Sequence, residues 1–302
     1  MLIRTLAGET PALPGVDILN AFNNNILLPF YLHVIIMLAM NMLLLSHTVS
    51  ILSFVYGFAV SLVMGLAAFF LRTISLSGMI GGIIFGTIIY GFTGWQGFLI
   101  PMTFFIVASA ATKHGYLQKL EMGIAQDAGG KRGAKHALAN ILAGTIFAVL
   151  SALLKWGFGT LSLVAMVGSF ATAVADTSSS EMGQLYGRTP INPITFKRVK
   201  PGTEGAISME GTLWGIAASL VIAIVAFVTH LIGLTACIAV VIGAFLGNMV
   251  ESYIGAKSGK EINNEVLNFL NTLIGGLISA LLAFLLTLVF SPPASNSMVI
   301  IN

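Results

Sequence analysis

Charged residues are scarce in this sequence of 302 residues: only 8% are Asp, Glu, Lys or Arg, whereas 57% are hydrophobic and the mean hydropathy is +0.95. One water-soluble core cannot bury so much apolar surface, so a lipid bilayer has to act as the solvent. Cysteine is almost absent, since Cys237 stands alone in an apolar run and excludes an intramolecular disulfide or a cysteine-based zinc site. These deficits predict an all-α fold, a polytopic integral membrane helical bundle.

Several functional signatures are missing as well. Residues 1–28 contain charged residues and prolines where a signal peptide would have its apolar stretch, so we expect a short cytoplasmic N-terminal segment there. No basic stripe interleaved with aromatic residues indicates a nucleic-acid partner, and the histidines lack the spacing of a transition-metal site. The absence of a nucleophile elbow, a kinase His-Arg-Asp signature and a catalytic triad disfavours covalent catalysis.

The apolar runs predict the membrane spans, because about 20 apolar residues are needed to cross the hydrocarbon core. We expect about nine transmembrane helices in a single catalytic domain over residues 29–290, followed by a short C-terminal tail over 291–302. The predicted spans are 29–46, 48–71, 76–92, 97–112, 136–154, 160–187, 211–232, 234–254 and 265–290.

The charges indicate the orientation of these spans. Every Lys and Arg except Lys155 lies in the N-terminal segment or in the connections after the second, fourth, sixth and eighth spans. Because a cationic excess marks the cytoplasmic side, we place the N-terminus in the cytoplasm and the C-terminus outside. The acidic residues gather on the same side, which predicts an active site on the cytoplasmic face.

The sixth predicted span carries polar residues in an apolar helix: Asp176, Thr177, Ser180 and Glu181. An ionised Asp in a membrane helix costs at least about 3 kcal/mol unless it is compensated, so it marks a functional site by default. Asp176 and Ser180 share one face, and Thr177 and Glu181 share the next. Hard oxygen ligands of this kind suit Mg²⁺, with Asp176 and Glu181 as its ligands. The alternative is a buried carboxylate that pairs with Lys or Arg for packing alone.

The connection after this span combines cations with glycine-containing turns. Cations neutralise phosphate charge, and backbone N–H groups around Gly202 and Gly205 can form a concave anion site. An ordinary positive-inside loop explains the cations equally well, but not the Pro-Gly-Thr-x-Gly turn. We expect Lys197 and Lys200 to act with Asp176 and Glu181 in catalysis. The substrate-binding candidates of this connection are Arg188, Arg198, Gly202, Thr203, Gly205 and Ser208.

Two further segments bring polar residues to the same membrane level. Lys131 and Arg132 lie in a Gly-Gly-Lys-Arg-Gly run that lacks the Gly-Lys-Ser/Thr ending of a Walker A motif. Asn264, Asn268 and Asn271 share one helical face, as substrate contacts or as an interhelical hydrogen-bond ladder. The remaining candidates are Lys131, Arg132, Asn140, Thr177, Ser180, Glu251, Ser252, Asn263, Asn264 and Asn268.

Four motifs occur in a specific order. They are Gly-Gly-Lys-Arg-Gly with Asn140, Ala-Asp176-Thr before Ser-Glu181-x-Gly, Pro-Gly-Thr-x-Gly at 201–205 with Ser208, and Glu251-Ser252 with Asn263-Asn264. This order resembles the phytyl-phosphate kinase family of integral membrane proteins, including transmembrane protein 19-like members, over residues 75–290. The elements around Asp176, Arg188 and Lys197 are more distantly similar to CTP-dependent polyprenol kinases and CDP-diacylglycerol synthases.

The resemblance implies a membrane-embedded, Mg²⁺-dependent phosphotransferase. Its partners would be the bilayer, a prenyl (phytyl) monophosphate acceptor and CTP or another nucleoside triphosphate, and its product a prenyl diphosphate for tocopherol-type lipids. The acceptor phosphate is already ionised at neutral pH, so alignment and electrostatic stabilisation suffice for the transfer. A CDP-lipid synthase, which releases pyrophosphate, and a cation-coupled transporter remain as alternatives.

Overall fold

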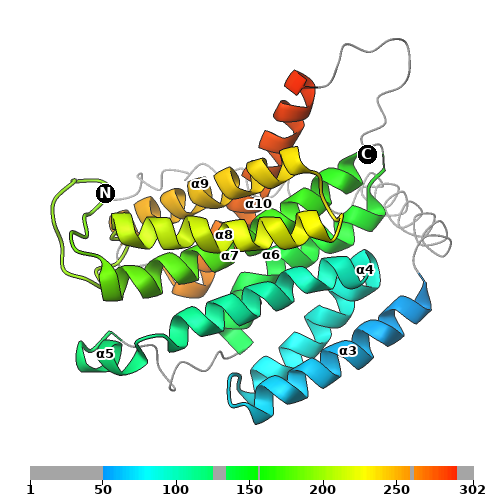
Figure 1. The fold of residues 1–302 in the computed structure, drawn as a ribbon, viewed down its shortest axis with the longest axis horizontal. Coiled ribbons are helices and arrows are strands. Elements are labelled where there is room, and N and C mark those ends of the chain that lie inside the picture. Colours follow the sequence, from blue (N-terminus) through cyan, green and yellow to red (C-terminus); the bar gives the residue numbers. More distant parts are fainter. Residues whose placement is uncertain (1–49, 125–133, 156, 259–261, 291–302) are drawn as a thin grey trace, which may run out of the picture. The chain divides into compact units, whose positions relative to one another are not determined.

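A computed structural model describes residues 50–124, 134–155, 157–258 and 262–290 (Figure 1). These residues belong to one packing unit. The predicted span 29–46, the N-terminal segment and the C-terminal tail lie outside the described residues.

Every regular element in the described ranges is an α-helix, which confirms the all-α prediction. The loop between α7 and α8 adds two isolated β-bridges. The helices are α3 (Ile51–Phe70), α4 (Leu76–Lys113), α5 (Tyr116–Glu121), α6 (Ala134–Leu153), α7 (Phe158–Tyr186), α8 (Met209–Val228), α9 (Leu234–Ser258) and α10 (Asn264–Phe290).

The helix α4 contains two of the predicted spans, 76–92 and 97–112. Its backbone leaves the helical conformation at Gly94, where φ is 70° and ψ is −169°. The Tyr90 and Phe98 rings nevertheless pack at a tilt with centroids 5.8 Å apart, and a Cβ built on Gly86 would lie 3.1 Å from the Phe98 ring. In a continuous helix Gly86 and Phe98 would be about 18 Å apart. The chain therefore reverses at Gly94, and α4 forms a helical hairpin.

Six described helices are long and apolar enough to cross a membrane: α3, α4, α7, α8, α9 and α10. The apolar part of α6, Leu138–Leu153, is shorter than that criterion requires. The described part of the chain is thus a polytopic helical bundle, while the total of nine spans and the side of the N-terminus stay predictions.

The helix α7 is the centre of this bundle. In its most apolar window 78% of the residues are buried, against 11% in α3. Small residues bring its neighbours close: a Cβ on Gly276 of α10 would lie 2.7 Å from the Ala165 carbonyl oxygen, and one on Gly215 of α8 would lie 3.0 Å from that of Ala175. Close backbone approach through glycine is typical of tightly packed membrane helices. Polar residues of α7 are consequently held in fixed positions.

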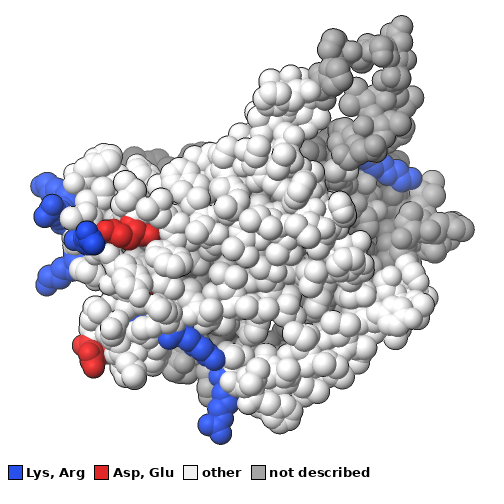
Figure 2. Space-filling view, viewed as in Figure 1, with Lys and Arg blue, Asp and Glu red and all other residues white. Residues whose placement is uncertain are grey.

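The helices alternate in direction, so the connections fall at two ends of the bundle. The loop after α3, the short helix α5 and the α7–α8 loop share one end, which is the left end in Figure 1. Figure 2 shows Lys and Arg side chains gathered at this end and an almost uncharged surface along the helices. Lys155, between α6 and α7, belongs to the opposite end. The charge asymmetry predicted from the sequence is therefore present in the described residues.

Candidate functional site

A polar cavity of about 690 Å³ lies at the cationic end of the bundle. Its walls come from α7, α8, α9, α10 and the α7–α8 loop, with one residue from α6. Most of the candidates predicted from separate motifs meet here. Those that line the cavity are Asn140, Asp176, Thr177, Ser180, Glu181, Gly202, Thr203, Gly205, Ser208, Glu251, Ser252, Asn264 and Asn268.

Two carboxyl groups meet on the cavity wall. The Glu251 carboxyl of α9 is within hydrogen-bonding contact of the Asp176 carboxyl of α7, and Glu204 of the loop lies close enough to act on Glu251 electrostatically. Asn271 of α10 donates a hydrogen bond from Nδ2 to Glu251 Oε2, and also to Asn248 Oδ1 at 3.3 Å. Adjacent carboxylates repel each other, and a bound cation relieves that repulsion. Helices distant in sequence thus bring two acidic side chains into contact at one site.

The cations lie elsewhere. None of the described residues that line the cavity is Lys or Arg. Lys197, Arg198 and Lys200 are exposed on the loop, and the Arg188 side chain is 89% exposed and only 4.0 Å from Glu210 through Nε and Oε1. Asn263 is also outside the lining, where its Oδ1 accepts a hydrogen bond from the Glu265 N–H at 2.8 Å. Lys131 and Arg132 lie outside the described residues.

The α7–α8 loop is held by its own hydrogen bonds. Ile191 and Ile207 exchange two backbone hydrogen bonds of 2.9 Å, and the Val199 N–H donates to the Pro190 carbonyl at 2.9 Å. The Thr203 N–H and hydroxyl both donate to the Lys200 carbonyl, at 3.2 and 2.7 Å. The N–H and the hydroxyl of Thr203, which were predicted to bind phosphate, therefore already donate hydrogen bonds within the turn.

Ser208 begins the next helix. Its Oγ accepts a hydrogen bond from the Gly211 N–H at 3.1 Å, so it is the N-cap of α8. Gly211 and Thr212, in the first turn of α8, line the cavity.

Gly205 joins the loop to α9 by close backbone contact. Its φ is +68°, and a Cβ at this position would lie 2.5 Å from the Ser252 carbonyl oxygen and 2.9 Å from the Ala256 Cα. No L-amino acid fits without displacing the helix backbone. This contact fixes the Gly202–Gly205 turn beside Glu251.

Replacement of Gly205 by Ala is expected to destabilise the protein by about 2–5 kcal/mol, since the left-handed conformation costs about 1–2 and overpacking about 1–3 kcal/mol. The matched control is Gly202→Ala, because Gly202 also has a positive φ of +78° but a Cβ there would meet only the Ile124 side chain, at 3.0 Å. The stability of both variants is measured by thermal unfolding in detergent. Equal losses would show that the contact with α9 does not matter.

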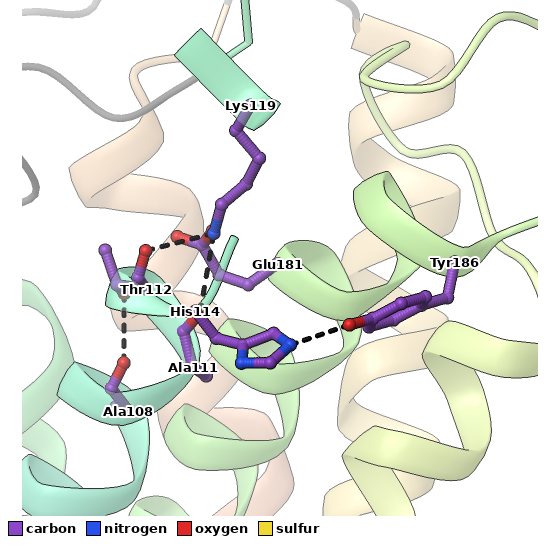
Figure 3. A network of polar contacts seen from close by, with 7 residues as sticks. All are labelled: Ala108, Ala111, Thr112, His114, Lys119, Glu181 and Tyr186. Atoms are coloured by element: carbon purple, nitrogen blue, oxygen red, sulfur yellow. Dashed lines mark hydrogen bonds and ion pairs between the residues drawn. The ribbon is translucent and has the colours of Figure 1, made fainter. Parts of the chain in front are cut away.

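Glu181 is engaged by a buried lysine (Figure 3). Lys119 of α5 is 1% exposed and forms an ion pair with Glu181 Oε2, whose side chain is 3% exposed. Lys119 Nζ also donates to the Thr112 carbonyl at 3.0 Å and the Ala111 carbonyl at 3.4 Å, at the end of α4. Beside it, His114 Nε2 and Tyr186 Oη are 2.6 Å apart. The contacts give Glu181 a role in fastening α5 to α7, and its role as a metal ligand stays a prediction.

Sequence reasoning missed three residues of this region. The sequence groups Lys119 with the cations of a cytoplasmic loop, yet it is buried; Asn248 and Glu204 are not among the candidates predicted from the sequence. Asn248 is spaced three residues before Glu251, so both lie on one face of α9. That spacing was the available signal, whereas nothing local to Lys119 indicates its burial.

The donor set of the cavity fits a hard divalent cation. Carboxylate and amide oxygens of Asp176, Glu251 and Asn248 are ligands that Mg²⁺ accepts, commonly one or two carboxylates completed by substrate phosphates and water. Asn271 Oδ1 and Glu181 Oε1 are buried and have no hydrogen-bond donor among the described residues. Within the same residues, no three His, Cys, Asp or Glu side chains form a ready-made metal cage. A cation here would therefore depend on a substrate for part of its coordination.

The helices and their carboxylate-lined cavity define a polytopic integral membrane protein. The chain belongs to the integral membrane protein DUF92 family, whose model matches residues 59–276. The family membership predicted from the motif order is thereby confirmed.

Relatives occur in plants, cyanobacteria and archaea. The chloroplastic protein VTE6 of Arabidopsis thaliana is 38% identical over 185 residues, which cover 61% of this chain and 56% of that protein. An uncharacterized membrane protein of Synechocystis is 35% identical over 57% of this chain and 67% of its own. An uncharacterized membrane protein of Methanocaldococcus jannaschii is 31% identical over a stretch that covers 61% of this chain and 74% of that protein. The chain thus matches just over half of the plant relative, and no solved structure matches it.

Proposed function

We propose that this protein is a Mg²⁺-dependent prenyl phosphate kinase. It transfers the terminal phosphoryl group of CTP or another nucleoside triphosphate to a prenyl monophosphate and so forms the prenyl diphosphate. The observation that carries the proposal is the meeting of Asp176 and Glu251 in a polar cavity at the end of membrane helices. The motif resemblance to phytyl-phosphate kinases supports the same reaction, and membership of the integral membrane family supports a membrane-embedded enzyme.

The acidic lining determines how phosphates bind. A cavity with carboxylates and no described Lys or Arg in its lining repels a bare polyphosphate but accepts one that arrives with a divalent cation. Asp176 and Glu251 would hold Mg²⁺. When bound, the ion neutralises charge on the phosphate oxygens during transfer. The charge pattern thus favours phosphoryl chemistry over recognition of a neutral ligand.

The chain's own residues orient the two substrates. The Ser180 hydroxyl and the Asn268 amide offer neutral donors around the acidic pair, and Asn140 and Thr177 line the same cavity. The Thr177 hydroxyl itself donates to the Ala173 carbonyl at 3.0 Å. An acceptor phosphate oxygen attacks the terminal phosphorus, the bond from that phosphorus to its bridging oxygen breaks, and the nucleoside diphosphate leaves with the electron pair. The acceptor is already ionised, so no residue has to remove a proton from it.

The exposed cations have a separate role in this account. Arg188, Lys197, Arg198 and Lys200 belong to the α7–α8 loop, which contributes other residues to the cavity lining. Positive charge on this loop raises the local concentration of a nucleotide, and this steering weakens as salt increases. By the positive-inside rule, the same cations support a site on the cytoplasmic face.

Product analysis tests the proposal. Purified protein is incubated with phytyl monophosphate, Mg²⁺ and each nucleoside triphosphate in turn, and lipid and nucleotide products are quantified by mass spectrometry. We expect prenyl diphosphate together with a nucleoside diphosphate, and no product when Mg²⁺ is chelated. Pyrophosphate with a CDP-lipid would establish a cytidylyltransferase instead, and no turnover with any donor would refute the kinase.

A further inference from the structure

A second, apolar cavity of about 300 Å³ lies between α8 and α9. Leu220, Ala223 and Phe227 of α8 face Leu234, Ile238 and Val241 of α9 across it. The polar surface in it is negligible, and at its floor the Cys237 thiol donates a weak hydrogen bond to the Ala223 carbonyl at 3.3 Å. The cavity is a groove suited to a hydrocarbon chain.

The groove lies next to the polar cavity along the same helix pair. On α8, Ile216 lines the polar cavity and Leu220, one turn later on the same face, lines the groove. On α9, Phe245 lines the polar cavity and Ile242, one turn earlier, lines the groove. The seam between α8 and α9 therefore changes from polar to apolar within about one helical turn, roughly 5 Å. Such a change matches a molecule with a charged head and an apolar tail.

Glycine packing explains why the seam is open. Gly215 of α8 packs against Ala175 and Ser179 of α7, whereas Gly243 of α9 packs against Ser279 of α10. Each helix thus makes its closest contacts with a different neighbour. The side chains between α8 and α9 do not fill the space between the two helices, and the groove remains.

We propose that the α8–α9 groove holds the isoprenoid chain of the prenyl monophosphate whose phosphate occupies the polar cavity. The inference rests on the proposed function and names the tail site of its acceptor. From Thr212, at the level of the acidic cavity, to Phe227 is about 22 Å along α8. An isoprene unit contributes roughly 5 Å of extended chain at C–C bond lengths of about 1.5 Å, so a chain of about four units reaches the far end of the groove.

A binding experiment tests the site without any need for turnover. A prenyl monophosphate of four isoprene units with a diazirine on its terminal unit is irradiated with the purified protein in detergent, and the labelled peptide is mapped by mass spectrometry. We expect labelling within 220–242, suppressed by unlabelled prenyl monophosphate but not by the corresponding alcohol or a phospholipid. Labelling on other helices, or labelling that all three suppress equally, would overturn the assignment.

A kinetic experiment distinguishes this inference from the kinase proposal. Ile238 and Ile106 are similarly exposed, at 52% and 58%, but only Ile238 lines the groove, so Ile106→Trp is the matched control for Ile238→Trp. Because Ile238→Trp removes burial of several CH₂ groups, we expect its KM for a four-unit acceptor to rise about tenfold and that for a one-unit acceptor to stay within about twofold. Equal effects on both acceptors would overturn the tail site. If the wild type phosphorylates neither acceptor while competed labelling maps to 220–242, the kinase fails and the tail site stands.

Discussion

Replacement of Asp176 by Asn is expected to lower kcat/KM for prenyl phosphate by about 10²–10³-fold, the usual effect of removing one preorganised electrostatic contact to the transition state. The substitution removes one negative charge and keeps the shape of the side chain. An amide can still donate a hydrogen bond to the Glu251 carboxyl that contacts Asp176, so we expect the fold to survive. The loss should therefore appear in activity and not in thermal stability.

Steady-state kinetics and thermal unfolding of the same preparation check this result. Glu121→Gln is the control, since Glu121 is an exposed acid on α5 outside the cavity lining, and it should retain wild-type kinetics. If Asp176→Asn keeps near-normal kcat/KM, the buried carboxylate serves packing alone and the account of the cavity fails. If it fails to fold, Glu251→Gln provides the second test of the same acidic pair.

Replacement of Lys119 by Met is expected to lower the free energy of unfolding by about 3–5 kcal/mol, because it leaves the buried Glu181 carboxylate without its cation. The substitution also removes the hydrogen bonds that Lys119 donates to the Ala111 and Thr112 carbonyls at the end of α4. Such a loss corresponds to a decrease in Tm on the order of 10 °C. The ion pair is thus expected to stabilise the packing of α5 against α7.

A double-mutant cycle measures the pair. Lys119→Met with Glu181→Gln removes both charges, so the double variant should be more stable than Lys119→Met alone. Lys113→Met is the control, since Lys113 is exposed in the last turn of α4. Additive effects of the two single changes would show that Lys119 and Glu181 do not stabilise each other.

The apolar runs predicted most of the helices, because the lipid environment demands a minimum apolar length whatever the tertiary contacts are. The predicted span 48–71 appears as α3 and 265–290 as α10. The separation of 76–92 from 97–112 also agrees with the reversal at Gly94, where only glycine readily takes a positive φ.

Side-chain placement at the site was harder to predict. Asp176 was recognisable because a carboxylate inside an apolar helix is costly, and its pairing with Glu251 became visible only when α7 and α9 were packed together. Lys197 and Lys200 were expected in catalysis, but composition gives a loop's charge and not the direction of its side chains. Lys119 is buried by contacts with α7, 62 residues away, which no local pattern encodes.

An experimental structure of the protein with prenyl monophosphate, Mg²⁺ and a non-transferable nucleotide analogue tests the central claim most directly. The account predicts phosphate density in the polar cavity, with the ion contacting Asp176 and Glu251 and the terminal phosphate of the nucleotide facing the acceptor phosphate. Phosphates bound only to the exposed cations of the α7–α8 loop, with the acidic pair unoccupied, would contradict it.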